Sequence, residues 1–260
     1  MSIFYRLGKN PARLFIIAQT LLLISFVWRE FPVFVFIAFA PMYALTDHPS
    51  ALKYSYLPFI VAIGTAFIFY YTMQQSMQQS SVLSWIIYFA LLATLFTVYI
   101  LLQRWTNNRL NKFTLLIFIL GMEYMLLKLM TDPNPVFLAD LLRYKHTWIR
   151  WNIFTGYTGA SLWILLTNLL FYQALFKQEK INWMLCFSAC MIILLPILFS
   201  ISQTSTALTK GDVLDFYTSG SNYNSIYLQR GELISRTGAW VSLLIIIFTL
   251  IKGLTKKVSR

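Results

Sequence analysis

The residue best placed for chemistry is Glu123, a carboxyl group inside the apolar stretch 114–130. A carboxylate at the centre of a membrane helix costs about 3 kcal/mol on insertion scales, so such a residue usually faces a cavity or a bonding partner. Lys128 lies five residues further on, a rotation of about 500° along an α-helix, and is therefore not an i, i+4 partner. We expect Glu123 to bond to another helix or to a basic residue of the following segment, either structurally or in a headgroup-binding site.

A second group of polar side chains lies at 132–152, between two apolar stretches. Residues 132–135, Asp-Pro-Asn-Pro, indicate a turn, and the residues that follow mix apolar, basic and aromatic side chains. We expect a short helix that lies in the membrane interface, where its cationic and aromatic side chains could hold lipid phosphates. The candidate lipid- or headgroup-binding residues are therefore Glu123, Lys128, Arg143, Lys145, His146, Trp148, Arg150 and Trp151. The alternative is an interfacial anchor with no specific ligand.

Neither the histidines nor the cysteines form a recognisable catalytic or metal-binding arrangement. His146 would need a nucleophile within reach to act as a general base, and the sequence around it offers no convincing triad. Cys186 and Cys190 lie about one helical turn apart in an apolar stretch, with no histidine or carboxylate beside them, so we expect buried and inert thiols. We therefore predict no catalytic residue, no metal site and no cofactor.

Long apolar stretches must position these residues. Of 260 residues, 58% are hydrophobic and only 12% are charged, whereas a soluble domain carries roughly 25% charged residues. A membrane helix needs about 17 to 25 residues. Apolar stretches that approach or reach this length lie near 14–28, 32–45, 57–73, 82–102, 114–130, 156–176, 183–200 and 238–254. The sequence predicts an all-α integral membrane protein in which residues 1–260 form a single domain with about eight transmembrane helices.

The basic residues indicate the orientation. Thirteen Lys and Arg lie on the side of the N-terminus and seven on the other side, whereas two acidic residues lie on the N-terminal side and six on the other. The positive-inside rule then places both termini in the cytoplasm and a polar loop at 203–237 in the periplasm. The first two stretches are short and form either a crossing hairpin or a re-entrant one. The same distribution speaks against nucleic acid as a partner, despite the net charge of +12.

Small residues on the helix predicted at 156–176 suggest a packing face. Gly156, Gly159 and Ala160 lie on one side of it, where they would allow helix backbones to approach closely. Asn168 lies deeper in the same helix and could hydrogen-bond to Glu123 across the bundle. We assign these residues to helix packing.

Residues 155–168 read TGYTGASLWILLTN. This segment resembles the TG-x-x-G-x-SLW-x-x-L-x-N helix in the membrane domain of apolipoprotein N-acyltransferases, in the form typical of Bacteroidota. Residues 39–42, 121–124 and 230–238 resemble further segments of the same family. The resemblance covers most of the chain and is strongest at 156–168. It implies eight spans with both termini in the cytoplasm.

The chain departs from this family where the family's chemistry resides. Family enzymes carry a nitrilase-like periplasmic domain between spans seven and eight. Its Glu-Lys-Cys triad transfers an acyl group from a phospholipid to the N-terminal amine of a lipoprotein. Here that place holds only residues 203–237, about 35 residues without a cysteine, whereas a domain usually needs at least about 50. The resemblance therefore implies a pseudoenzyme, a lipid-associated scaffold without the family's triad.

These expectations lead to one main hypothesis and two alternatives. The main hypothesis is a non-catalytic protein of the bacterial inner membrane that binds phospholipid or lipoprotein acyl chains, or joins other membrane or periplasmic subunits. The first alternative is the membrane half of a split apolipoprotein N-acyltransferase, whose nitrilase-like domain is a separate chain. The second is a lipid transporter or flippase, against which the lack of a visible internal repeat speaks.

Overall fold

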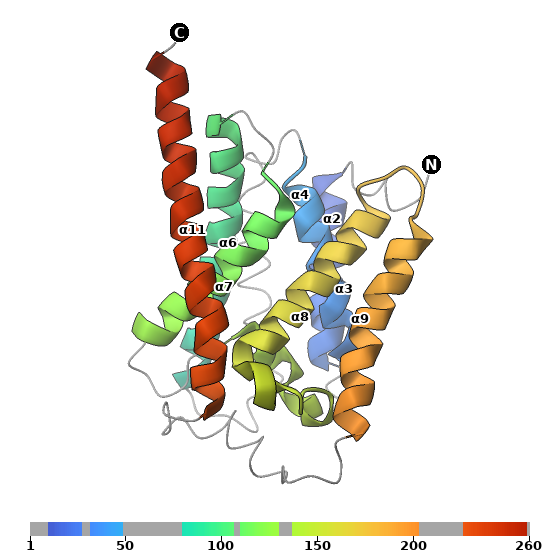
Figure 1. The fold of residues 1–260 in the computed structure, drawn as a ribbon. Coiled ribbons are helices and arrows are strands. Elements are labelled where there is room, and N and C mark those ends of the chain that lie inside the picture. Colours follow the sequence, from blue (N-terminus) through green and yellow to red (C-terminus); the bar gives the residue numbers. More distant parts are fainter. Residues whose placement is uncertain are drawn as a thin grey trace.

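The computed structural model describes residues 10–27, 32–48, 80–106, 110–129, 137–202 and 226–258, and these residues form helices and connections without a strand (Figure 1). The helices are α2 (Pro11–Val27), η1 (Pro32–Phe34), α3 (Val35–Ala38), α4 (Ala40–Leu45), α6 (Ser80–Thr106), α7 (Lys112–Leu129), η2 (Leu138–Trp148), α8 (Asn152–Leu175), α9 (Trp183–Ser202) and α11 (Ile226–Val258). The C-terminal end of α11 and the α8–α9 connection lie at one end of the bundle, and η2 lies at the other (Figure 1).

Several of the described helices have the length and composition of membrane helices. Four of them are long and apolar enough to cross a membrane, through Ile87–Trp105, Thr158–Leu175, Trp183–Ser202 and Glu232–Thr255. Shorter apolar helices lie at Pro11–Leu22 and Pro32–Leu45, and α7 has 18 residues but carries three charged side chains. The described part of the chain is thus all-helical, as predicted. The span predicted at 57–73 lies outside the described residues.

The last helix is longer than predicted. α11 begins at Ile226, so residues 226–237, which were assigned to the polar loop at 203–237, form about three helical turns ahead of the span predicted at 238–254. Glu232 in this extension pairs with Lys128 of α7, with 2.8 Å between Oε1 and Nζ. Hydropathy marks only the apolar part of a helix, so it missed these polar turns. Residues 203–225 and residues 132–136 of the predicted interfacial segment lie outside the described part.

The second predicted span is interrupted. α3 and α4 are separated at Phe39, and Pro41 in the first turn of α4 has no N–H to continue a helical hydrogen-bond ladder. Backbone groups at this break bond to Asn168 of α8. Its Oδ1 accepts the N–H groups of Phe39 at 2.8 Å and Ala40 at 3.1 Å, and its Nδ2 donates to the Val35 carbonyl at 2.9 Å.

The Asn168 amide therefore links α8 to the α3–α4 break through hydrogen bonds. Its Nδ2 also donates to the Ile164 carbonyl within α8 at 2.8 Å, so both ends of the amide are used. The predicted hydrogen bond between Asn168 and Glu123 is wrong, because the interrupted helix takes the amide. The spacing of residues in α8 gives no sign of the break between α3 and α4, so the sequence could not predict this partner of Asn168.

Glycines bring α7 and α11 into close contact. A Cβ at Gly121 would lie 3.0 Å from the Cα of Ala239, and a Cβ at Gly238 would lie 3.4 Å from the backbone nitrogen of Gly121. The Ser242 hydroxyl lies near the Gly238 carbonyl at 2.7 Å and near the Ile117 carbonyl of α7 at 3.2 Å. In lipid the hydrophobic effect does not drive helices together, so close packing of small residues and interhelical hydrogen bonds stabilise such a crossing.

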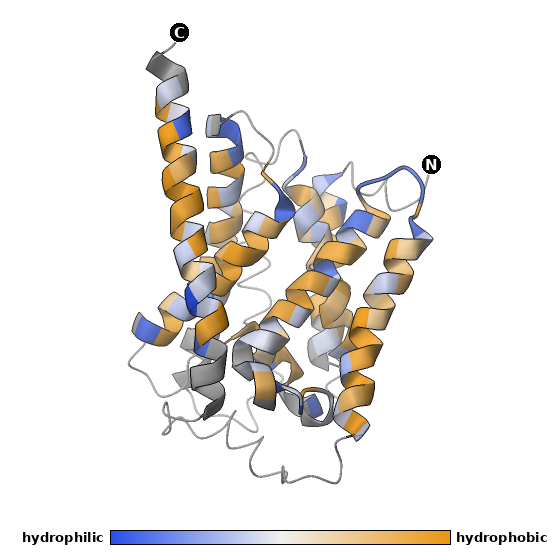
Figure 2. Cartoon of the chain, in the orientation of Figure 1, coloured by the Kyte–Doolittle hydropathy of each residue, from blue (hydrophilic) through white to orange (hydrophobic). Residues whose placement is uncertain are grey.

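α9 and α11 are rich in apolar residues (Figure 2), and many of their large apolar side chains are exposed. Only 22% of the residues in the most apolar part of each of these helices are buried, whereas 72% are buried in α8. These exposed faces therefore suit contact with lipid. Cys186 of α9 is half-buried, Cys190 is exposed, and both are free thiols. The expectation of two buried thiols is wrong for Cys190, because α9 packs against the bundle through one face only.

Asn168→Leu should weaken the bundle, because the side chain keeps its size but the N–H groups of Phe39 and Ala40 lose their acceptor. A buried donor without a partner costs about 1–3 kcal/mol, and we expect the free energy of unfolding to fall by that amount. Equilibrium unfolding in mixed micelles measures it. Gln173→Leu, a half-buried position on the same helix, is the control and should change stability by less than about 0.5 kcal/mol. Equal losses in the two variants would contradict the fastening role.

Candidate functional site

A buried carboxylate joins four elements of the fold. Glu123 of α7 is fully buried. Its Oε1 accepts hydrogen bonds from the Tyr88 hydroxyl of α6 at 2.9 Å, from the Ser161 hydroxyl of α8 at 2.9 Å and from the Leu138 N–H of η2 at 2.8 Å. The Ser161 oxygen in turn accepts the Ala139 N–H at 3.2 Å. α6, α7, α8 and η2 are therefore held together around a single oxygen atom.

The second carboxylate oxygen is in a different situation. Glu123 Oε2 is buried and has no hydrogen-bond partner among the described residues. An ionised carboxylate offers about four acceptor positions on its two oxygens, and buried polar atoms in proteins are normally paired. Oε2 is therefore able to accept a hydrogen bond from a ligand or a water molecule.

The Glu123 network fixes η2 against the end of the bundle. Leu138, Ala139 and Leu142 of η2 are completely buried. The Phe137 N–H donates to Asp140 Oδ2 at 2.8 Å and so caps the start of this helix. The segment predicted to lie in the interface is thus bound to α7 and α8 through backbone hydrogen bonds, with its apolar side chains packed inward.

The structure separates the predicted headgroup-binding residues into two places. Lys128 lies beside α11, where it pairs with Glu232. Trp148 and Trp151 instead meet α9 at Ser200, whose hydroxyl donates to the Trp148 carbonyl at 3.0 Å and accepts the backbone N–H of Trp151 at 3.4 Å. The backbone of these two residues therefore bonds the end of η2 and the start of α8 to α9.

The other predicted residues follow the same segment. Lys145 and Arg150 are half-buried, and Lys145 occupies a kink in η2 with φ −113° and ψ 53°. Arg143 and His146 lie on η2, but their side chains are outside the described part of the structure.

Unpaired polar atoms gather at the start of α8. Of seven buried side-chain N and O atoms that have no hydrogen-bond partner among the described residues, four lie between Trp151 and Thr155. They are Trp151 Nε1, Asn152 Oδ1, Asn152 Nδ2 and Thr155 Oγ1. The Trp151 ring packs edge-on against Trp163 with 5.6 Å between centroids, which fixes the direction of its N–H. Trp151 was predicted from the sequence, whereas Asn152 and Thr155 were not, because their burial depends on the tertiary fold.

A glycine creates the local geometry of this site. Gly156 has φ 66° and ψ −172°, a conformation that only glycine adopts readily, and it interrupts the regular helix inside α8. A Cβ at Gly159 would lie 2.0 Å from Thr155 Oγ1 and 3.1 Å from the Trp151 ring. Gly156 and Gly159 therefore shape the chain around Trp151 and Thr155, and their role in close helix packing stays a prediction. Ala160 is completely buried.

A second polar cluster lies at the other end of α7. Lys112 is only 7% exposed and pairs with Asp47, with 2.7 Å between Nζ and Oδ1. Its ammonium also donates to the Thr46 hydroxyl, and the Tyr172 hydroxyl donates to Asp47 Oδ2. The Tyr99 ring lies 5.1 Å from Lys112 Nζ. This cluster ties the end of α4 to α6, α7 and α8.

The sequence alone did not predict this cluster. The charge count assigned Lys112 and Asp47 to connections on the same side of the membrane, and it gave no reason to pair them. Eleven residues separate Lys112 from Glu123, about 16 Å along α7, so the two clusters are distinct. In the described part of the chain, no three His, Cys, Asp or Glu side chains gather closely enough to hold a metal ion.

No protein-family model, curated protein or solved structure matches this chain. The family suggested by residues 155–168 therefore stays a proposal, and function has to be inferred from the geometry of the site.

Glu123→Leu should loosen η2, because three donors lose their acceptor. We expect the free energy of unfolding to fall by at least about 2 kcal/mol and the amides of Leu138 and Ala139 to exchange faster. Glu123→Gln is the matched control, since its amide oxygen can accept the same bonds and should retain most of the protection. Hydrogen–deuterium exchange across 137–148 measures both variants. Unchanged exchange in Glu123→Leu would show that η2 is held by other contacts.

Lys112 and Asp47 should behave as a coupled pair. Either Lys112→Met or Asp47→Asn alone leaves a partner charge unpaired, and the double variant removes both charges. We expect a coupling free energy of about 1–3 kcal/mol in a double-mutant cycle of unfolding in micelles. Additive effects of the two substitutions are the result that would refute the pairing.

Proposed function

We propose that this chain is a non-catalytic membrane protein that binds the polar end of a phospholipid or of a lipoprotein's lipid anchor where η2 meets α8. The observation that carries the proposal is the set of buried, unpaired polar atoms on Trp151, Asn152 and Thr155. Polar atoms that are buried without a partner cost free energy, and a ligand that pairs with them recovers it. Asn152 is 7% exposed and contributes both a donor and an acceptor.

The chemistry of these atoms suits a lipid headgroup region. The Trp151 indole N–H and the Asn152 amide N–H groups can donate to ester carbonyl or phosphate oxygens. The Asn152 and Thr155 oxygens can accept from a hydroxyl or an ammonium group. Lys145 and Arg150 on the adjoining segment are half-buried cations that favour a phosphate.

The proposed position of this site is the outer face of the bacterial inner membrane, with both termini in the cytoplasm. The α8–α9 connection, with Lys177 and Lys180, lies at the same end of the bundle as the C-terminal end of α11, with Lys252 (Figure 1). The positive-inside rule makes this basic end cytoplasmic. η2 and the polar atoms at the start of α8 then face the periplasmic leaflet.

The family resemblance supports the same proposal. The resembling segment, residues 155–168, contains Thr155, the Gly156 break and the Ser161 bond to Glu123. The resemblance implies a scaffold that handles lipid. The absence of a cysteine from residues 203–237 supports a role without the family's covalent chemistry.

A split acyltransferase is the second candidate. α9 ends at Ser202 and α11 begins at Ile226, and these are the helices between which the family carries its catalytic domain. A separate nitrilase-like chain could act beside them. Its recovery with this protein, together with acyl transfer by the complex, would favour this candidate over the first one.

Asn152→Leu and Trp151→Phe should lower lipid binding without unfolding the protein. The protein is purified from bacterial membranes in mild detergent, and bound lipid and lipoprotein are quantified per protein by mass spectrometry. We expect both variants to lose most of the bound lipid, and Asn152→Leu to keep or raise the melting temperature, since it removes unpaired buried atoms.

Trp183→Phe on the exposed face of α9 is the control for the tryptophan substitution and should retain lipid as the wild type does. A variant Asn152→Leu that melts earlier but retains its lipid would show that the amide is structural, and it would remove the proposed site.

A further inference from the structure

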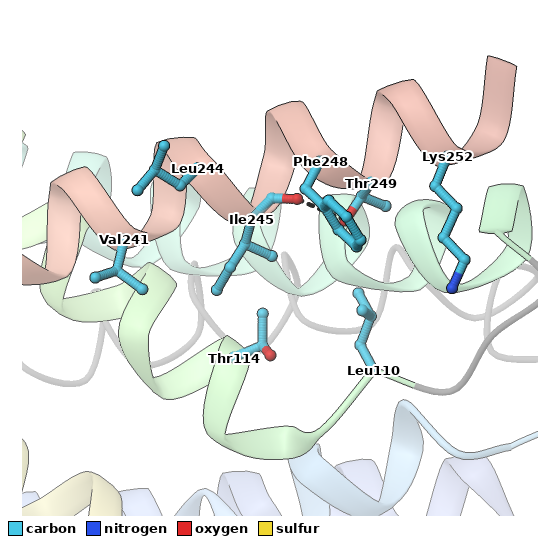
Figure 3. A pocket seen from close by; sticks show the side chains of 8 residues that line it. All are labelled: Leu110, Thr114, Val241, Leu244, Ile245, Phe248, Thr249 and Lys252. Atoms are coloured by element: carbon cyan, nitrogen blue, oxygen red, sulfur yellow. Dashed lines mark hydrogen bonds between the residues drawn. The ribbon is translucent and has the colours of Figure 1, made fainter. Parts of the chain in front are cut away.

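α11 and the beginning of α7 enclose a groove that is separate from the site at η2. Its volume is about 370 Å³, within the range of roughly 300–1,000 Å³ for small-molecule pockets. The lining residues are Val241, Leu244, Ile245, Phe248, Thr249 and Lys252 of α11, with Leu110 and Thr114 opposite them (Figure 3).

The groove is apolar along its length and cationic at one end. The Thr249 hydroxyl donates to the Ile245 carbonyl at 2.6 Å, so it is paired within α11. Leu244 and Phe248 are 63% and 66% exposed, which opens the groove to the surroundings of the bundle. The Lys252 ammonium lies at the end of the row of side chains (Figure 3). A ligand that fits has a long apolar part and an anionic end.

The cationic end of the groove lies where lipid headgroups are expected. Lys252 is three residues from the end of the candidate span Glu232–Thr255. Trp105, the last residue of the candidate span in α6, lies against Gly253, where a Cβ would come within 2.2 Å of its Nε1. Tryptophans and lysines at the ends of membrane helices mark the level of the headgroups. From that level the groove extends toward the middle of the span.

We propose that this groove binds an anionic glycerophospholipid, with its phosphate against Lys252 and one acyl chain along Ile245 and Val241. On the topology proposed above, this lipid belongs to the cytoplasmic leaflet. The charge at the end of the groove favours this occupant. A partner's transmembrane helix would place apolar side chains against Lys252, whereas a phosphate neutralises it.

Native mass spectrometry of the full-length protein tests this proposal. The protein is released from nanodiscs that contain equal amounts of phosphatidylglycerol and phosphatidylcholine, and the retained lipids are counted. A lysine near the surface favours an anionic lipid by about five-fold, so the wild type should retain phosphatidylglycerol over phosphatidylcholine by that factor. Lys252→Gln should lose the preference. Lys180→Gln makes the same charge change on the exposed α8–α9 connection and should keep it.

A second pair of variants tests the apolar part of the groove. Val241→Trp fills it and should reduce the retention of both lipids, whereas Leu243→Trp on the same helix lies outside the lining and should not. Equal lipid preference in Lys252→Gln and Lys180→Gln would overturn the proposal, and so would full retention in Val241→Trp. Repeating the measurement in Asn152→Leu separates this groove from the site at η2, because the preference set by Lys252 should persist there.

Discussion

The arrangement of this protein depends on one buried carboxylate. Glu123 is fully buried among apolar helices, where an unsatisfied charge would be costly, and its Oε1 accepts hydrogen bonds from α6, α8 and η2. The cost of leaving any of those donors unpaired in an apolar setting makes the junction specific. It places η2 across the end of the bundle and the start of α8 beside it. The unpaired atoms of Trp151, Asn152 and Thr155 owe their position to this junction.

Polar groups elsewhere in the bundle follow the same logic. The Asn168 amide satisfies the backbone at the α3–α4 break, and Lys112 with Asp47 joins the opposite end of α7 to its neighbours. In lipid, packing of apolar side chains alone gives little preference for one helix partner over another. A few hydrogen-bonded groups therefore select the helix neighbours, while α9 and α11 present their remaining apolar faces to the surroundings. The unpaired atoms at the start of α8 differ from these hydrogen-bonded groups because the described residues leave them without a partner.

The sequence predicted the helices well where apolar residues run together, and it singled out Glu123 because a lone carboxyl in such a run needs a partner. It could not identify that partner, since Tyr88 and Ser161 are ordinary residues until the fold brings them together. The first turns of α11 were not predicted as helix, because they are polar and the prediction relied on runs of apolar residues. The sequence also showed no sign that Gly156, with its positive φ, interrupts the helix within α8. Asn152 carries no signal in sequence, because only burial without a partner distinguishes it.

The central claim is that a lipid's polar end completes the hydrogen bonding at the start of α8. A cryo-electron-microscopy map of the protein in lipid nanodiscs tests it directly. The account predicts lipid density that reaches the Trp151 indole nitrogen, the Asn152 amide and the Thr155 hydroxyl, with η2 held at Glu123. A map in which these groups bond to other side chains of the chain, with no lipid density beside them, would contradict it.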